Sequence, residues 1–115
     1  MDEFALIRKY FQPLTSAPED VALGIGDDCA VLRPGAGEDL AVTTDTLVAG
    51  RHFDPAARAE DIGWKSLVVS LSDLAAMGAR PRWFVLALTL PQADEAWLER
   101  FAKGLKAAAD KGGIA

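Results

Sequence analysis

Apolar residues recur at every third or fourth position in three stretches of the chain, which is the spacing of one helical face. The pattern predicts helices over residues 3–14, 58–78 and 94 to about 111. Pro13 is the stop signal of the first helix, Gly78 ends the second, and Asp94 is the expected N-cap of the third. The residues expected to face the core are Phe4, Ile7, Tyr10, Phe11, Ile62, Leu67, Leu71, Leu74, Trp97, Leu98, Phe101 and Leu105.

Shorter apolar segments bounded by glycine and proline predict strands. Residues 21–23 and 28–32 flank a glycine-containing loop, and a turn at 34–37 leads to residues 40–46, the expected second arm of a hairpin. Residues 82–90 are rich in β-branched and aromatic side chains and apolar on both faces, which is typical of a buried strand. The order helix, strand pair, helix, strand, helix predicts an α+β fold in which helices pack on a small mixed β-sheet.

The composition of the chain mainly excludes certain classes of partner and location. The 115 residues carry a net charge of -5 and contain no Lys/Arg cluster, so a nucleic-acid partner is not expected. The chain has no apolar run of membrane-spanning length and no secretion leader, so we expect no membrane association and a cytoplasmic location. The single Cys29 cannot form an internal disulfide and favours a reducing compartment, and we expect it to be a small core residue.

The length of the chain suits one domain with its own core. The last residues, 112–115, have the composition of an exit from a helix into a following strand. We therefore expect residues 1–115 to form a single domain that is a fragment of a longer protein.

Four aspartates stand where apolar segments end, each among glycine, serine or threonine: Asp27, Asp28, Asp45 and Asp73. Carboxylates at the edge of a core repel one another unless a cation is shared between them. Oxygen ligands of this kind suit Mg²⁺, which proteins hold through one or two carboxylates together with substrate phosphates. The pattern indicates half of a metal–phosphate site.

Each aspartate also has a structural interpretation. Asp27 and Asp28 follow two glycines and can simply close a turn, and Asp45 can form an Asx turn at the end of a strand. Asp73 lies late in its helix, where the helix dipole disfavours an acid, which indicates some other reason for its presence. A lone His52 in a loop is, on its own, more typical of an ordinary loop residue than of a catalyst.

Three long motifs occur in a fixed order: GIGDDCA at 24–30, TDTLVAGRHF at 44–53 and KSLVVSLSDLAAMGA at 65–79. Together with LALTLP at 86–91 and EAWL at 95–98, they closely resemble the N-terminal domain of the thiamine-monophosphate kinase family. The resemblance covers essentially the whole chain. It departs from the family in having Ser70 where Asn is usual, and the family's next motif, Gly-Gly-Asp-Thr, would fall just beyond Ala115.

The resemblance implies a fold similar to aminoimidazole ribonucleotide synthetase, with N-terminal domains paired in a homodimer and ATP in a cleft completed by a C-terminal domain, here absent. The implied reaction transfers the γ-phosphoryl group of ATP to thiamine monophosphate and yields thiamine diphosphate. The chain has no Walker-type Gly-x-x-x-x-Gly-Lys loop, so aspartates holding Mg²⁺ would have to neutralise the phosphates.

The resemblance also implies individual roles. It implies Mg²⁺ ligands at Asp28, Asp45 and Asp73, with Thr43 and Thr44 adding oxygens, a further phosphate or metal contact at Asp27, and a contact between His52 and thiamine monophosphate. No catalytic acid or base is assigned, because a substrate phosphate oxygen is already anionic near neutral pH. Two alternatives stay open: a synthetase of the same fold with another substrate, and a non-catalytic dimerisation or metal-binding module.

Overall fold

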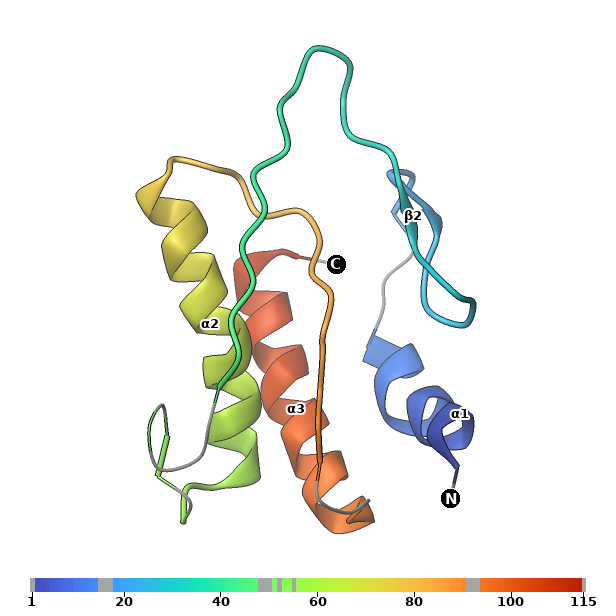
Figure 1. The fold of residues 1–115 in the computed structure, drawn as a ribbon, viewed down its shortest axis with the longest axis vertical. Helices are drawn as coiled ribbons and strands as arrows, with labels where there is room; N and C mark the ends of the chain where they lie inside the picture. The colour runs from blue at the N-terminus through green and yellow to red at the C-terminus, as the bar shows by residue number, and fades with distance from the viewer. Residues whose placement is uncertain are drawn as a thin grey trace.

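Two helices of 18 residues each, α2 (Ala59–Ala76) and α3 (Glu95–Gly112), form the centre of the molecule. The computed structural model describes residues 2–14, 18–47, 51, 53–54, 56–90 and 94–114. The two helices lie side by side and run in the same direction, and the chain between them returns along one side of the pair (Figure 1). Most core side chains come from this pair, and Leu98 and Phe101 are almost fully enclosed.

The main chains of α2 and α3 are in direct contact, because each helix has a glycine where the two cross. A Cβ atom on Gly63 would lie 2.1 Å from the carbonyl oxygen of Phe101, and one on Gly104 would lie 1.8 Å from that of Glu60. Both distances are far shorter than van der Waals contact, so no residue larger than glycine fits without moving a helix. The separation of α2 and α3 is therefore set by their main chains.

The predicted ends of both helices are confirmed. The Asp94 carboxylate accepts a hydrogen bond from the Trp97 amide at 3.2 Å, and α3 ends at Gly113 with a left-handed φ of 64°. α2 is followed by Gly78, whose φ is 69°. Among the side chains expected to face the core, Ile62, Leu67, Leu98, Phe101 and Leu105 are buried, whereas Leu71, Leu74 and Trp97 are half-buried.

The N-terminal stretch is helical, as predicted, but irregular. It consists of α1 (Glu3–Leu6), the π-helical turn η1 (Ile7–Phe11) and the 3-10 turn η2 (Gln12–Leu14). Tyr10 and Phe11 are buried, but Phe4 is 71% exposed, so its assignment to the core is wrong. A π turn takes in an extra residue, which rotates the positions before it away from the face formed by those after it. Phe11 packs edge to face on Phe101 of α3, with ring centroids 6.3 Å apart.

The sheet is a short antiparallel hairpin of β1 (Val21–Leu23) and β2 (Val31–Leu32). β1 agrees with the sequence prediction, whereas β2 covers only Val31–Leu32 of the predicted 28–32, and the expected pairing of the second segment with residues 40–46 is wrong. The backbone amide of Arg33 donates to the carbonyl of Asp20 at 2.7 Å, so β2 is hydrogen-bonded to the chain that precedes it. Residues 40–46 belong to no strand within the described ranges.

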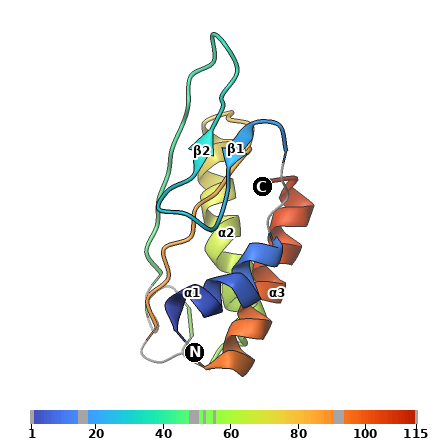
Figure 2. The same ribbon diagram turned by 90° about the vertical axis from the view of Figure 1, so that its right-hand side faces the viewer.

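Residues 82–90 also form no strand ladder with any described segment, so the prediction of a strand buried on both faces is wrong. Phe84, Leu88 and Leu90 are half-buried and pack on the core, whereas Val85 is 78% and Leu86 37% exposed. The physical reason is that the helices cover only one side of this segment (Figure 2). The α+β class is confirmed, with helices beside a two-stranded sheet.

Candidate functional site

The first pair of aspartates lies in the loop that joins β1 to β2. Gly26 has a φ of 123°, a conformation that favours glycine, and the Asp27 carboxylate accepts a hydrogen bond from the Asp28 amide at 2.8 Å. This local bond matches the turn interpretation of Asp27 and leaves the side chain of Asp28 exposed. Cys29 in the same loop is exposed, so its assignment to the core is wrong; the loop projects from the hairpin and contributes no core residue.

The second group lies against α2. Asp45 is near the end of the extended segment 40–47, and the Ser70 hydroxyl lies 3.5 Å from its Oδ2, the long limit of a hydrogen bond. Asp73 follows Ser70 by about one helical turn and is exposed, so it occupies a neighbouring position on the helix surface. Thr43 is half-buried and Thr44 exposed on the same extended segment. The structure thus associates Asp45 with the part of α2 that carries Asp73.

These two groups do not form one ligand sphere. Across the described ranges, no three His, Cys, Asp or Glu side chains are close enough to hold a metal ion together. His52 lies outside the described residues, so its predicted contact has no structural counterpart here. The ligand set therefore stays a prediction, in which Asp45 and Asp73 are near each other on α2 and Asp28 is carried by a separate hairpin.

The chemistry of the donors nevertheless fits Mg²⁺. Asp28, Asp45 and Asp73 are exposed carboxylates, and none of them forms an ion pair with a described Lys or Arg. The described ion pairs use other acids: Asp20, Glu38, Glu60, Glu95 and Asp110. Hydrated, unpaired carboxylates with hydroxyl and carbonyl oxygens nearby are the ligands that a hard divalent cation prefers.

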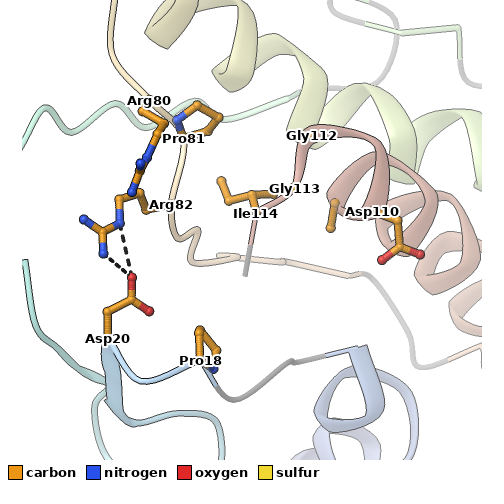
Figure 3. Close-up of a pocket in the computed structure, with 10 residues that line it drawn as sticks. Pro18, Asp20, Arg80, Pro81, Arg82, Asp110, Gly112, Gly113 and Ile114 are labelled. Carbon is orange, nitrogen blue, oxygen red and sulfur yellow. Dashed lines mark hydrogen bonds and ion pairs between the residues drawn. The ribbon is translucent and has the colours of Figure 1, made fainter.

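A cavity of about 620 Å³ lies beside the hairpin but is not lined by any predicted site residue. Its walls come from the chain before β1, from residues 80–82 and from the end of α3 (Figure 3). On one wall the Arg82 guanidinium binds the Asp20 carboxylate, and this hydrogen bonding holds the pKa of Asp20 below its ordinary value. The same pairing raises the pKa of Arg82.

Sequence reasoning missed this ion pair entirely. Arg82 and Asp20 are 62 positions apart, and neither belongs to a motif or to a periodic pattern that would have singled it out. Arg82 also binds Glu38 at 3.2 Å. An isolated arginine at the start of a predicted strand gave no signal of a partner so distant in sequence.

Comparison with known proteins identifies the class. Residues 26–115 match the family described as AIR synthase related protein, N-terminal domain, and the chain belongs to this family. Within the described ranges, no helix has the length and apolar character needed to cross a membrane.

The chain is similar to thiamine-monophosphate kinases from several bacteria. The one from Escherichia coli (strain K12) is 57% identical over 103 residues, which are 90% of this chain and 32% of that protein. The one from Haemophilus influenzae is 49% identical over 105 residues, 91% of this chain and 32% of that protein. A crystal structure of thiamine-monophosphate kinase from Stenotrophomonas maltophilia K279a superimposes with a TM-score of 0.85 at 56% identity, covering 100% of this chain and 36% of that one. This chain thus spans about a third of the length of the curated relatives it matches.

Proposed function

We propose that this chain is the N-terminal domain of a thiamine-monophosphate kinase, a phosphotransferase that uses ATP and Mg²⁺ to convert thiamine monophosphate to thiamine diphosphate. The observation that carries the proposal is 57% identity to such a kinase over 90% of the chain. The 103 matched residues make up 90% of the chain, so the match includes the segments that contain the three motifs.

In this proposal the aspartates hold the metal that the reaction needs. Asp28, Asp45 and Asp73 bind Mg²⁺, Thr43 and Thr44 contribute oxygens, and Asp27 makes a further metal or phosphate contact. When bound, the cation neutralises the phosphate oxygens around which negative charge accumulates during transfer. The chain's own task is to place anionic ligands on two different segments so that nucleotide and acceptor meet in line.

His52 is proposed to contact thiamine monophosphate. Replacing His52 with Ala in the full-length protein should raise the Michaelis constant for thiamine monophosphate more than that for ATP, because a contact to one substrate contributes binding to that substrate. Steady-state kinetics with each substrate varied in turn measures the two constants. Equal increases in both would contradict a substrate-specific role for His52.

We further propose that the protein is a cytoplasmic homodimer joined through this domain. The apolar side chains on the outer side of the extended segments support the pairing: Leu40 is 58%, Val42 75% and Val85 78% exposed. Monomeric proteins seldom expose several large apolar side chains together, and a second copy could bury them. The free, exposed thiol of Cys29 is consistent with a reducing compartment.

The proposed activity is tested directly on the full-length protein. Mg·ATP is supplied with thiamine monophosphate, with no acceptor, or with an unrelated phosphate monoester, and the release of ADP and formation of thiamine diphosphate are measured. We expect turnover only with thiamine monophosphate and only when Mg²⁺ is present. Turnover with the unrelated phosphate monoester but not with thiamine monophosphate would indicate a same-fold enzyme of different specificity. Metal binding without any turnover would indicate a non-catalytic module.

A further inference from the structure

The hairpin that carries Asp27 and Asp28 has little packing to hold it in place. No residue of β1 or β2 belongs to the hydrophobic core, and Leu23 and Val31 are 39% and 45% exposed. Two strands of this length are only marginally stable by themselves in water. We therefore expect polar contacts to the rest of the molecule to determine the position of the loop that carries Asp27 and Asp28.

Arg82 provides the main described polar contact of this kind. Its Nε lies 3.1 Å from Asp20 Oδ2, and its Nη2 donates to the same oxygen (Figure 3). The two side chains are only 23% and 22% exposed, so the pair is partly shielded from solvent. The guanidinium also lies over the Trp83 ring, 4.8 Å from its centroid, which restricts its rotamers.

The two partners of Arg82, Asp20 and Glu38, lie next to the segments that carry Asp28 and Asp45. Asp20 immediately precedes β1, and its backbone carbonyl accepts the hydrogen bond from Arg33 that closes the open end of the hairpin. Glu38, which accepts from Arg82 Nη1 at 3.2 Å, stands between β2 and the extended segment that ends near Asp45. One guanidinium thus connects the chain on either side of the β1–β2 hairpin to the segment 81–90, whose apolar side chains pack on the core.

We propose that Arg82 is a positioning residue for the metal site. It fixes the hairpin that bears Asp28 relative to the helix that bears Asp73, and it fixes the start of the segment that leads to Asp45. The geometric part of this inference stands on the contacts above, and the part that concerns metal affinity rests on the proposed function. Arg82 would touch neither metal nor substrate.

The geometric part is tested without metal by hydrogen exchange of backbone amides in the full-length protein. Arg82→Ala should accelerate exchange across residues 21–33 by about three- to tenfold while leaving α3 unchanged. Arg80→Ala is the matched control, because Arg80 is exposed, is two positions away and forms no ion pair with a described acid. Unchanged exchange in the hairpin of the Arg82 variant would overturn the proposal, whatever the protein's activity.

The functional part is tested by titrating the same proteins with Mn²⁺ as a stand-in for Mg²⁺ and recording free Mn²⁺ by electron paramagnetic resonance. Arg82→Ala should weaken Mn²⁺ binding about three- to tenfold, Arg82→Lys should recover part of the loss, and Arg80→Ala should bind normally. Equal Mn²⁺ affinity of wild type and Arg82→Ala would overturn the positioning role. Absence of Mn²⁺ binding in the wild type would overturn the proposed metal site. The hydrogen-exchange experiment would then still show whether Arg82 fixes the position of the hairpin.

Discussion

The helix pair and the extended side of this molecule are stabilised in different ways. α2 and α3 satisfy their backbone hydrogen bonds internally and bury Leu98, Phe101 and Leu105 against each other. Residues 40–47 and 82–90 are extended, lack a strand partner among the described residues and expose Val42 and Val85. A helix is complete once its own sequence folds, whereas a strand needs a neighbour for its main chain. The candidate site draws on both regions, with Asp73 on α2 and Asp45 on the extended side, whereas Asp28 lies on the separate hairpin.

The largest effect is expected from removing a ligand charge. Asp45→Asn or Asp73→Asn in the full-length protein should reduce turnover by several orders of magnitude, because water cannot replace a charged ligand that stabilises the transferring phosphoryl group. Both side chains are exposed, so the fold should stay intact. Steady-state kinetics measures the loss, with circular dichroism as the control. Near-normal turnover in both variants would contradict their assignment as ligands.

The contrast in burial predicts a contrast in stability. Leu98→Ala should lower the free energy of unfolding by about 2–5 kcal/mol, because Leu98 is 0% exposed and its removal leaves a cavity. Val85→Ala should cost less than about 0.5 kcal/mol, because Val85 is 78% exposed. Chemical denaturation followed by circular dichroism measures both.

The exposed Val85 also gives a test of pairing. Val85→Lys should weaken self-association, as measured by sedimentation velocity over a range of concentrations, without lowering monomer stability. If Val85→Lys assembles like the wild type, the outer side of residues 82–90 is not part of a dimer interface. If Val85→Ala is strongly destabilising, this side is more enclosed than its exposure indicates.

A smaller effect is expected from adding one methyl group at the helix crossing. Gly104→Ala should destabilise the protein by about 1–3 kcal/mol, because the new Cβ would lie 1.8 Å from the Glu60 carbonyl oxygen and the helices must separate. Gly24→Ala is the matched control in the hairpin loop, where a Cβ has an ordinary contact of 3.7 Å with Val21. Thermal unfolding compares the two, and equal midpoints would show that the crossing tolerates the methyl group.

The smallest effect concerns the contact between the N-terminal helical stretch and α3. Glu95 accepts hydrogen bonds from Lys9 Nζ and the Tyr10 hydroxyl, each at 2.9 Å, and the Lys9 contact is the larger cause of the lowered pKa of Glu95. Its folded pKa is below the ordinary 4.5, so its stabilisation is present above pH 4.5 and is lost as the pH falls through the folded value. Glu95→Gln should therefore flatten the acid side of the stability–pH profile, as urea unfolding at a series of pH values would show. An unchanged slope would mean that Glu95 makes no measurable contribution.

The sequence was most informative where structure is local. Periodicity together with Gly78 and the N-cap Asp94 predicted the bounds of α2 and α3, because a helix is determined by residues three or four apart. The irregular turn that exposes Phe4 was not predicted, since nothing in its spacing distinguishes a π turn from an α turn. The strand pairing was also wrong, because composition indicates extended backbone but does not identify its neighbour.

For the candidate site, the sequence predicted which residues take part but not how they are arranged in space. Motifs and resemblance selected Asp28, Asp45 and Asp73, and the structure relates Asp45 to α2 through Ser70. How Asp28 is carried relative to the other two depends on the contact between Arg82 and Asp20, which joins residues far apart in the chain. Such a contact is a property of the folded backbone, and one sequence contains no pattern that reveals it.

That separation of 62 positions has a consequence for how the chain folds. Helical turns form from neighbouring residues, whereas the contact between Arg82 and Asp20 can form only after a long loop has closed, with the entropy loss that closure entails. We therefore expect the helices to order early and the hairpin that carries Asp27 and Asp28 to dock late. During synthesis, residues 20–38 would leave the ribosome well before Arg82 exists to bind Asp20 and Glu38, so the hairpin would stay accessible to proteases until Arg82 has emerged.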